Sequence, residues 1–483
     1  MYMNKLEPAL VWKYFDDILK IPRISKNEEQ IIAYLEQFAK DHGLAFKKDS
    51  VGNCLLSKAA LKGFEKRQTV ILQSHLDMVG EKLAEVDHDF STDPIKAVVR
   101  DGWMYAEGTT LGADDGIGVA ASLAILASDN LKHGPLECLF TVDEETGMTG
   151  AFGIQEGFFS GKILLNLDSE EEGELFIGCA GGIDTVGTFK MKSRKVNAKH
   201  TAITIKIGGL RGGHSGDEIH KGYGNAIKLL TLILWKLDKD FSYRLVSING
   251  GKLRNAIPRE AEAIVVMARG TKDGFIKNTE LIVEWIKELY KDVDPDISLE
   301  IQETEITNSC MKREVQNRLI HTLYACPNGV ISWSRDIEGL VQTSTNLAVI
   351  KDLGQAIEVV TSQRSSSTFE KTEISDRIEA LFRLAKGKVM HSDGYPGWKP
   401  NPNSQILELS KGVYKKLFDK DPEIKAIHAG LECGLFLEKY PDLDMVSFGP
   451  TIRGAHTPEE RIEIASVQKF WDFLLGILES IPA

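Results

Sequence analysis

The chain has 483 residues, about three times the length of a usual single domain, so two or more hydrophobic cores are expected. With 42% hydrophobic and 27% charged residues, its composition is that of a folded globular protein and excludes a disordered or fibrous chain. The net charge is −12, from 58 Lys and Arg against 70 Asp and Glu, which disfavours binding to nucleic acid or to an anionic membrane surface.

The lack of a visible targeting signal and the pattern of cysteines predict a cytoplasmic protein. The longest nearly uncharged apolar stretch, residues 117–127, is too short to span a bilayer. The amino-terminal letters MYMNKLEP lack the basic start, apolar middle and small-residue cleavage site of a secretory signal. The six cysteines form no C-x-x-C pair and are expected to be buried thiols in a reducing compartment. We therefore expect an acidic cytoplasmic enzyme.

Residues 1–182 alternate helix and strand signals. Residues 27–42 predict a helix because apolar side chains recur at helical spacing, and Ser25 with Glu28 predicts a capping box before it. Residues 116–128 predict a second, strongly apolar helix. Continuous apolar runs predict strands buried on both faces at 69–72, 136–142 and 163–167. This pattern predicts an α/β domain with a mixed, mostly parallel sheet covered by helices.

The pattern changes in residues 183–392. Strands that alternate apolar and polar residues predict an α+β domain with one exposed sheet face. The Gly-, Pro- and Asn-rich segment 391–404 predicts a crossing between domains, after which helix and strand signals of the first kind return. We therefore predict a discontinuous catalytic domain, 1–182 and 393–483, with residues 183–392 inserted as a second domain.

Groups able to bind metal follow the predicted buried strands. The candidates are His75 and Asp77 after the first strand, Asp143, Glu144 and Glu145 after the second, Asp168 after the third, His456 beyond a fourth, and Asp114 and Asp115 in the loop GADDGIG. In open parallel sheets, ligands bind at the carboxyl ends of the strands, where all these groups are expected.

Converging carboxylates would repel one another strongly unless cations neutralise them. Two imidazoles with carboxylates suit zinc better than calcium or magnesium, and two ions about 3.5–4 Å apart could share one carboxylate and activate a water. Asp77 is expected to orient the ring of His75, two residues away on the same strand face. Taken singly, each motif has a simpler reading: a hydrogen-bonded H-x-D pair, a solvated Glu-Glu turn, an Asp-Asp helix cap.

The segments HLD, GADDG, DEETG, LNLDSE and AHTPEE occur in this order. They resemble the motifs of the di-zinc amidohydrolase and peptidase family that contains aminoacylase, glutamate carboxypeptidase and the carnosinases. The resemblance covers essentially the whole chain and is strongest to members that cleave aminoacyl-histidine dipeptides. It implies two Zn²⁺ per subunit, replaceable by Co²⁺ or Mn²⁺. His75 and Asp168 would hold one ion, Glu145 and His456 the other, and Asp114 would bridge them.

The same resemblance implies roles for the neighbouring groups. Asp77 would orient His75, and Glu144 would act as general base on the water between the metals. A cis peptide is expected between Asp114 and Asp115, and Asp115 receives no ligand role.

The inserted domain is implied to be a lid and dimerisation domain that completes the site. His214, in GGLRGGHSG, would stabilise the oxyanion in the neighbouring subunit of a homodimer, and Asn255 would contact the substrate or oxyanion. Arg364 would bind the substrate carboxylate through its planar fork. The backbone near Gly430 and Glu432 would line the amino-terminal side of the substrate. Without the resemblance, His214 reads as part of a Gly-rich hairpin and Arg364 as a surface arginine.

The expected function is zinc-dependent hydrolysis of small peptides, preferentially Xaa-His dipeptides including β-Ala-His, by a metal-bridged hydroxide with a glutamate base. The alternatives are a tripeptidase or an N-acyl amino-acid deacylase of the same family. An inactive metal-binding scaffold is a further alternative, against which the intact Glu144 argues. A nucleic-acid hydrolase is disfavoured because the chain is acidic and has no basic stripe.

Overall fold

The computed structural model describes residues 5–197, 199–335 and 337–483. The chain forms two compact units, which are Met1–Cys179, Trp398–Ala426 and Leu431–Ala483 for the first, and Ala180–Gly397 and Ile427–Gly430 for the second. The second unit is thus an insertion in the first. The short segment Ile427–Gly430, from the carboxyl-terminal part of the chain, also belongs to the second unit. The sequence carried no signal for this last segment.

The first unit is built on a sheet that, among the described residues, has eight strands in the order β1-β2-β6-β3-β7-β21-β8-β20. Its central strands β6, β3, β7 and β21 run parallel, and β1, β2 and β8 are antiparallel to their neighbours. The bounds are β1 Ala45–Lys48, β2 Cys54–Lys58, β3 Val70–His75, β6 Leu136–Thr141, β7 Ile163–Asn166, β8 Glu174–Cys179, β20 Glu423–Ile427 and β21 Asp444–Ser447. Every residue of β3 and β7 is buried, as their continuous apolar sequences predicted.

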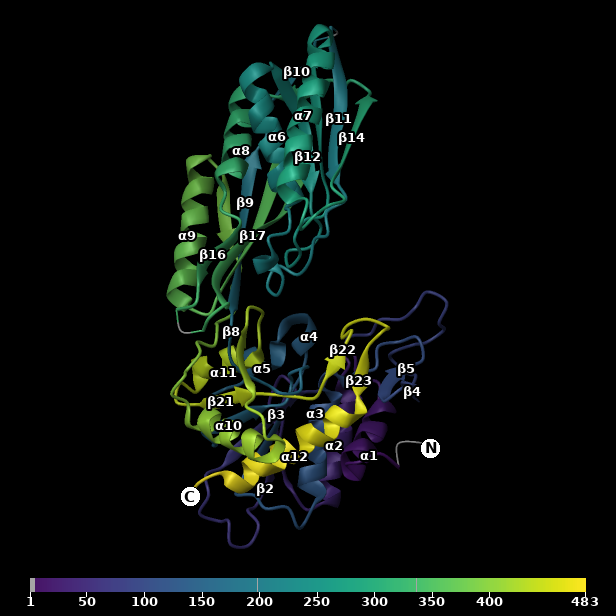
Figure 1. The fold of residues 1–483 in the computed structure, drawn as a ribbon, viewed down its shortest axis with the longest axis vertical. Helices are drawn as coiled ribbons and strands as arrows, with labels where there is room; N and C mark the ends of the chain where they lie inside the picture. Colours follow the sequence, from purple (N-terminus) through teal and green to yellow (C-terminus); the bar gives the residue numbers. More distant parts are fainter. Residues whose placement is uncertain (1–4, 198, 336) are drawn as a thin grey trace. The chain divides into compact units, whose positions relative to one another are not determined.

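Helices cover this sheet (Figure 1). They are α1 Ala9–Leu19, α2 Glu29–Asp41, α3 Ala113–Ala127, α4 Glu144–Gly147, α5 Thr149–Gly153, α10 Gln405–Phe418, α11 Glu432–Lys439 and α12 Ile464–Ser480. Helix α3 packs between α1 and β3 and is buried along nearly its whole length, which explains why it is apolar on all sides. None of the described helices is long and apolar enough to cross a membrane.

A smaller sheet lies beside the main one, with the strand order β22-β23-β5-β4. Its strands are β4 Ala97–Arg100, β5 Trp103–Ala106, β22 Ile452–Arg453 and β23 Arg461–Glu463. The antiparallel pair β22–β23 closes the loop that carries His456, so this small sheet fixes both ends of that loop.

The second unit contains an antiparallel sheet in the order β14-β11-β13-β12-β17-β18-β9-β19, with β16 also paired to β17, and a two-stranded ribbon β10–β15, as far as the structure describes it. The bounds are β9 Gly181–Lys190, β10 Ser193–Lys195, β11 His200–Gly208, β12 Tyr243–Gly250, β13 Ala261–Ala268, β14 Ser298–Thr304, β15 Ser309–Met311, β16 Gly329–Trp333, β17 Val341–Asp352, β18 Ala356–Ser365 and β19 Lys388–His391.

One continuous hydrophobic core joins this sheet to its helices. The helices are α6 Ala226–Asp240, α7 Lys272–Tyr290, α8 Arg313–Ala325 and α9 Thr368–Leu384, with short 3-10 turns η2 Ile219–Lys221 and η3 Arg269–Thr271. Side chains such as Ile205, Leu234, Phe275 and Phe382 meet in this core. Because all four helices share it, they cover one face of the sheet, which accounts for the alternating sequence of strands such as β11.

The capping box predicted at Ser25 and Glu28 is wrong. Helix α2 starts at Glu29 without a side-chain cap. The hydroxyl of Ser25 donates to the Asp77 carboxylate at 2.8 Å instead, and Glu28 accepts from the backbone N–H of Asp143 at 3.0 Å. These side chains bind distant loops, which a local sequence pattern does not reveal. The prediction of buried thiols is confirmed, since all six cysteines lie in the described ranges and are free and buried.

Candidate metal centre

Three site segments follow the parallel strands at the core of the first unit. Strand β3 ends at His75, β6 leads into the turn Asp143–Glu145, and β7 is followed by Asp168. Because β3 pairs in parallel with both β6 and β7, these ends lie at the same edge of the sheet. The amino-terminal end of α3 adds Asp114.

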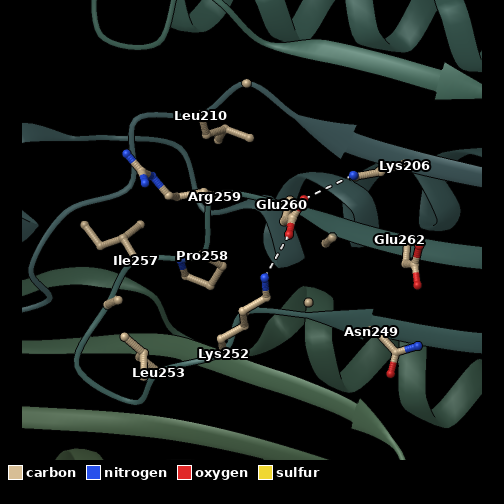
Figure 2. A pocket seen from close by; sticks show the side chains of 15 residues that line it. Lys206, Leu210, Asn249, Lys252, Leu253, Ile257, Pro258, Arg259, Glu260 and Glu262 are labelled. Atoms are coloured by element: carbon tan, nitrogen blue, oxygen red, sulfur yellow. Dashed lines mark ion pairs between the residues drawn. The ribbon is translucent and has the colours of Figure 1, made fainter. Parts of the chain in front are cut away.

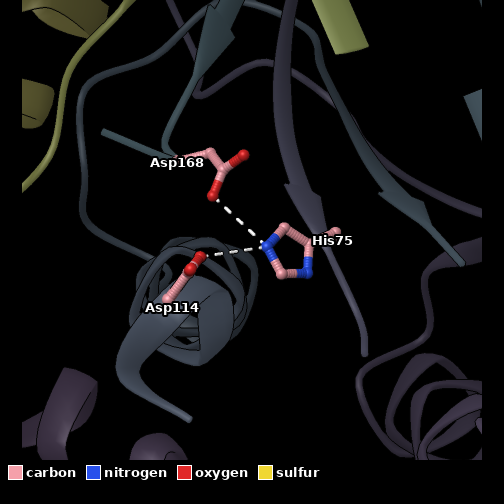
Figure 3. Close-up of side chains that lie close together, drawn as sticks. All are labelled: His75, Asp114 and Asp168. Carbon is pink, nitrogen blue, oxygen red and sulfur yellow. Dashed lines mark hydrogen bonds and ion pairs between the residues drawn. The ribbon is translucent and has the colours of Figure 1, made fainter. Parts of the chain in front are cut away.

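A first group of metal-binding atoms surrounds His75 (Figure 3). Its Nε2 lies 3.1 Å from Asp114 Oδ1 and 3.3 Å from Asp168 Oδ1. One ligand atom from each of the three residues lies within 4.8 Å of the others. The ring of His75 is 1% exposed, so its position is fixed by the surrounding core.

A second group shares Asp114 with the first. His456 Nε2 lies 3.1 Å from Asp114 Oδ2 and 3.0 Å from Glu145 Oε2. His456 has a left-handed backbone (φ 63°) in the loop between β22 and β23. Asp114 therefore offers one carboxylate oxygen to each imidazole, which is the arrangement that a bridging ligand requires.

Burial raises the pKa of two carboxyls at this centre, Asp168 and Glu144, whereas burial would also raise the pKa of the shared Asp114 but hydrogen bonds to His456 and His75 lower it. The pKa of Asp168 is raised well above its usual value by burial, although the charge of His75 opposes the shift. The pKa of Glu144 is also raised well above its usual value, first by burial and then by the nearby Glu432 and Glu145 carboxylates. The centre is thus richer in negative charge than its surroundings can stabilise.

The raised pKa values of the two imidazoles reflect the same excess of negative charge. Burial alone would lower the pKa of His75, but the charge of Asp168 and hydrogen bonds to the carboxylates raise that pKa well above its usual value. Hydrogen bonds to Asp114 and Glu145 raise the pKa of His456 to about 11. Carboxylates that attract protons this strongly attract divalent cations for the same electrostatic reason.

The chemistry of the donors fits a first-row divalent metal. Each group offers one imidazole nitrogen and two carboxylates, a donor set suited to zinc. Three protein ligands per ion is also the number found in catalytic zinc sites, which keep a further position for water or substrate.

The Asp77 carboxylate binds the turn that carries the two glutamates. His75 Nδ1 lies 3.1 Å from the carbonyl oxygen of Asp77 and 3.5 Å from its Oδ1. The carboxylate accepts from the backbone N–H of Glu144 at 3.0 Å and of Glu145 at 3.2 Å. Burial would raise the pKa of Asp77, but these contacts, with His75 foremost, lower it to about 2, so the group is ionised.

The expected cis peptide between Asp114 and Asp115 is present. Asp115 is 1% exposed and its Oδ1 accepts from the backbone N–H of Gly118 at 3.1 Å. A Cβ atom at Gly118 would lie 2.3 Å from this carboxylate, so glycine is required there. Asp115 belongs to neither donor group in the described chain.

Glu460 fixes the loop that leads to Asp114, although no sequence pattern predicted this role. Its carboxylate accepts four consecutive backbone N–H groups, at 2.8, 2.9, 2.7 and 3.3 Å from residues 111, 112, 113 and 114. Glu460 is 2% exposed. In AHTPEE nothing distinguished it from its neighbour Glu459, which is exposed.

Two predicted substrate residues meet in the second unit. The backbone N–H of Ser215, next to His214, donates to the carbonyl of Asn255 at 2.8 Å. His214 Nδ1 lies 2.9 Å from Asp217 Oδ2, and its backbone N–H donates to Glu218 at 2.9 Å. The stretch is therefore an ordered loop with a fixed imidazole.

Arg364 and Gly430 also belong to the second unit. Arg364 is buried in β18, so it is not a surface arginine; its Nη1 donates to Tyr395 Oη at 2.9 Å, and its Nε has no partner among the described residues. A Cβ atom at Gly430 would lie 2.9 Å from the Tyr395 ring. Glu432, by contrast, belongs to the first unit, where its buried carboxylate accepts from Gln73 and Thr141, both at 2.7 Å. Its side chain therefore faces strands β3 and β6.

A surface pocket of about 670 Å³ lies in the second unit (Figure 2). The Glu260 carboxylate in it pairs with Lys206 at 3.1 Å and with Lys252 at 3.5 Å. The lining residues include none of the predicted metal ligands. We assign this pocket no part in the chemistry.

Two donor groups joined by a shared carboxylate, at the carboxyl edge of a parallel sheet, are an arrangement suited to a metal-dependent hydrolase. The chain belongs to the peptidase family M20/M25/M40, whose model matches residues 71–480. The family predicted from the sequence motifs is thereby confirmed, and with it a dependence on metal.

Similar proteins extend this result over the whole chain. The cytosol non-specific dipeptidase of Escherichia coli (strain K12) is 42% identical over 481 residues, covering 100% of this chain and 99% of that protein. The crystal structure of aminoacylhistidine dipeptidase from Vibrio alginolyticus superimposes with a TM-score of 0.92 at 42% identity, over 100% of this chain and 98% of that one. The predicted fold class is therefore confirmed. A tripeptidase from Staphylococcus aureus, at 16% identity and a TM-score of 0.57 over 99% of both chains, shares the fold.

Proposed function

We propose that this protein is a metal-dependent dipeptidase that prefers Xaa-His substrates, including β-Ala-His. The observation that carries the proposal is the pair of donor groups joined by Asp114 in a chain 42% identical, over its full length, to a dipeptidase. The names of the two similar proteins, a non-specific and an aminoacylhistidine dipeptidase, support dipeptides as the substrate class.

Two Zn²⁺ ions per subunit are proposed as the cofactor, with Co²⁺ or Mn²⁺ able to replace them. His75, Asp114 and Asp168 would hold one ion, and Asp114, Glu145 and His456 the other. When bound, the metals would polarise the scissile carbonyl and lower the pKa of the attacking water.

Glu144 is proposed to move the proton. It would accept a proton from the attacking water and donate it to the leaving amine nitrogen as the C–N bond breaks. Its pKa is raised well above that of an ordinary glutamate by burial and by neighbouring carboxylates, and a raised pKa suits a group that must both accept and donate a proton. The Asp77 carboxylate would hold Glu144 in place by accepting a hydrogen bond from the backbone N–H of Glu144.

Residues of the second unit are proposed to bind the substrate. Arg364 would pair with the carboxylate of the dipeptide, so that chain length is limited at that end, and Asn255 would contact the substrate. His214 of the neighbouring subunit of a homodimer would stabilise the oxyanion, a contribution of about 2.7–4 kcal/mol for one such donor. The backbone at Gly430 and Glu432 would line the amino-terminal side. We infer a cytoplasmic location from the similar E. coli protein, which is called cytosolic.

A substrate panel tests the function. Purified protein would be assayed with Gly-His, β-Ala-His, Gly-Leu, Gly-Gly-His and N-acetyl-His, before chelation, after chelation and after return of zinc. We expect hydrolysis of the dipeptides, fastest for those that end in histidine, loss on chelation and recovery with zinc. Faster hydrolysis of Gly-Gly-His or N-acetyl-His would favour the tripeptidase or deacylase instead.

Mixed subunits test the shared site. Glu144→Ala and His214→Ala each disable one half of the proposed site, so a heterodimer of the two variants keeps one intact site. We expect mixed and re-equilibrated subunits to regain activity that neither variant has alone. Absence of recovery, once subunit exchange is verified, would contradict a role of His214 in the neighbouring subunit.

A further inference from the structure

The connection between α1 and α2 contains three polar side chains that reach loops of the metal centre. We refer to Arg23, Ser25 and Glu28 as the amino-terminal brace. Arg23 is 2% exposed and Glu28 is 6% exposed, and each of the three side chains has a partner more than 50 residues away in sequence. Glu28 also accepts from the nearby backbone N–H of Lys26 at 3.0 Å. The brace precedes residue 71, where the match to the family model begins.

Arg23 joins two of these loops. Its Nη1 donates to the carbonyl oxygens of Leu76 and Asp77, both at 2.8 Å, immediately after His75. Its Nη2 donates to the carbonyl of Gly112, two residues before Asp114. One rigid guanidinium thus sets the spacing between the strand end that carries His75 and the loop that carries Asp114.

Ser25 and Glu28 act on the third loop, the turn Asp143–Glu145. Three consecutive N–H groups of this turn are bound by two carboxylates: that of Asp143 by Glu28, and those of Glu144 and Glu145 by Asp77. The hydroxyl of Ser25 donates to Asp77 Oδ2 at 2.8 Å. One of these two carboxylates, that of Glu28, thus belongs to the brace, and the other, that of Asp77, is anchored by Ser25.

This turn needs support from outside. Asp143 has a left-handed backbone (φ 54°), a conformation that non-glycine residues adopt only when their surroundings fix it. The chemistry depends on the turn, because a general base must lie within hydrogen-bond reach of the proton that it accepts. A misplacement of about 1 Å is enough to cost about 100-fold in rate.

We propose that the amino-terminal brace is a set of positioning residues that hold Glu144 and Glu145 in their working places. The inference rests on the proposed function, because the proposed function makes Glu144 of this turn the general base and Glu145 a metal ligand. It predicts that loss of the brace lowers kcat and loosens the turn, while substrate affinity and the fold of the second unit stay unchanged.

Glu28 offers the sharpest test, because its neighbour Glu29 is an exposed carboxylate at the start of α2 and serves as a matched control. In zinc-loaded protein, Glu28→Ala is expected to lower kcat at least about 10-fold with KM changed less than about 2-fold. Glu28→Gln keeps an acceptor oxygen for the Asp143 N–H and is expected to restore most of kcat. Glu29→Ala is expected to match the unchanged protein. Ser25→Ala, which removes one hydroxyl, should give a smaller loss of the same kind.

Hydrogen exchange at residues 141–147 gives a readout that needs no substrate. We expect faster exchange there in Glu28→Ala, with metal content and exchange in the second unit unchanged. The proposal is overturned if Glu28→Ala behaves like Glu29→Ala in both measurements. It is also overturned if Glu28→Ala loses activity only in proportion to unfolded protein, or if Gln does not rescue. Failure of the unchanged protein to cleave dipeptides would refute the proposed function, whereas the exchange result would still decide whether the brace holds the turn.

Discussion

Glu144 and Glu145 are adjacent in sequence but have different surroundings. Glu145 Oε2 lies 3.0 Å from His456 Nε2 and belongs to a donor group, whereas Glu144 belongs to neither group in the described chain. Both start the first turn of α4, where successive side chains point in different directions. Under the proposed function, these adjacent glutamates would supply one metal ligand, Glu145, and one general base, Glu144.

Substitution of each glutamate separates these roles. Glu144→Gln removes the base without removing a ligand, so we expect kcat to fall about 10²–10⁴-fold with metal content unchanged. Glu145→Gln weakens a ligand, so we expect metal to be lost at a lower chelator concentration. Elemental analysis and steady-state kinetics on both variants check this. Loss of metal from Glu144→Gln would refute its assignment as base.

Glu460 is expected to matter for stability and for metal binding together. Glu460→Ala leaves four backbone N–H groups of residues 111–114 without their acceptor, at a cost of about 1–3 kcal/mol for each buried group that stays unpaired. We expect a lower denaturation midpoint and weaker zinc binding, because Asp114 ends this loop. The exposed neighbour Glu459→Ala is the control and should change neither quantity. A Glu460→Ala protein with unchanged zinc affinity would show that the loop keeps its shape without the carboxylate.

At the scale of elements, the sequence predicts best what depends on local pattern. The buried strands β3, β6 and β7 and the apolar helix α3 are continuous hydrophobic runs, and each was predicted to within a few residues. Three of the predicted metal-binding residues, His75, Glu145 and Asp168, lie at or just after the ends of these strands. The structure brings them together with Asp114 and His456 at distances of 3.0–3.3 Å. Strand ends are thus readable from sequence because burial and polarity change there abruptly.

Elements defined by distant partners were not predicted. The two-residue strand β22 has no hydrophobic pattern of its own, and it exists because β23 pairs with it. Ser25 and Glu28 have the spacing of a helix cap but bind loops 52 and 115 residues away. The four-residue segment Ile427–Gly430 belongs to the second unit through contacts that no local pattern encodes.

That segment carries His428, whose surroundings predict a pH dependence. Burial, and then the charge of Arg364, lower the pKa of His428 to about 3, and its Nε2 lies 2.7 Å from Ser344 Oγ. Asp217 and His220 also act on it. Because the folded protein binds this proton less well than the unfolded chain, His428 contributes stability above pH about 6.5 that is lost as the pH falls toward about 3.

His428→Gln removes this titration. Relative to the variant, we expect the unchanged protein to lose up to about 1.4 kcal/mol of unfolding free energy per pH unit below pH about 6.5. Thermal denaturation of metal-free protein between pH 7.5 and 5 measures the difference. His321→Gln, at an exposed position on α8, is the control and should track the unchanged protein. Parallel pH profiles for the unchanged protein and His428→Gln would contradict a neutral buried imidazole.

For the whole molecule, the five candidate ligands come from segments between His75 and His456 yet all belong to the first unit. Ions bound there would join the amino-terminal part of the chain to the part that returns after the insertion. Ligand binding stabilises only the state that binds, by about 4 kcal/mol when the free ion exceeds its dissociation constant 1,000-fold. Metal should therefore stabilise the first unit and leave the stability of the second unit unchanged, because the second unit has a separate hydrophobic core.

Chelation tests this division. We expect removal of metal to speed hydrogen exchange in the loops around Asp114, Glu145 and His456 and to lower the first unit's denaturation midpoint. Exchange in the core helices α6 and α8 of the second unit should stay the same, since their stability rests on a separate hydrophobic core. Return of zinc should reverse the change. Equal loosening of both units on chelation would mean that the metal centre supports the fold of the whole chain, and that the second unit does not stand on its own core.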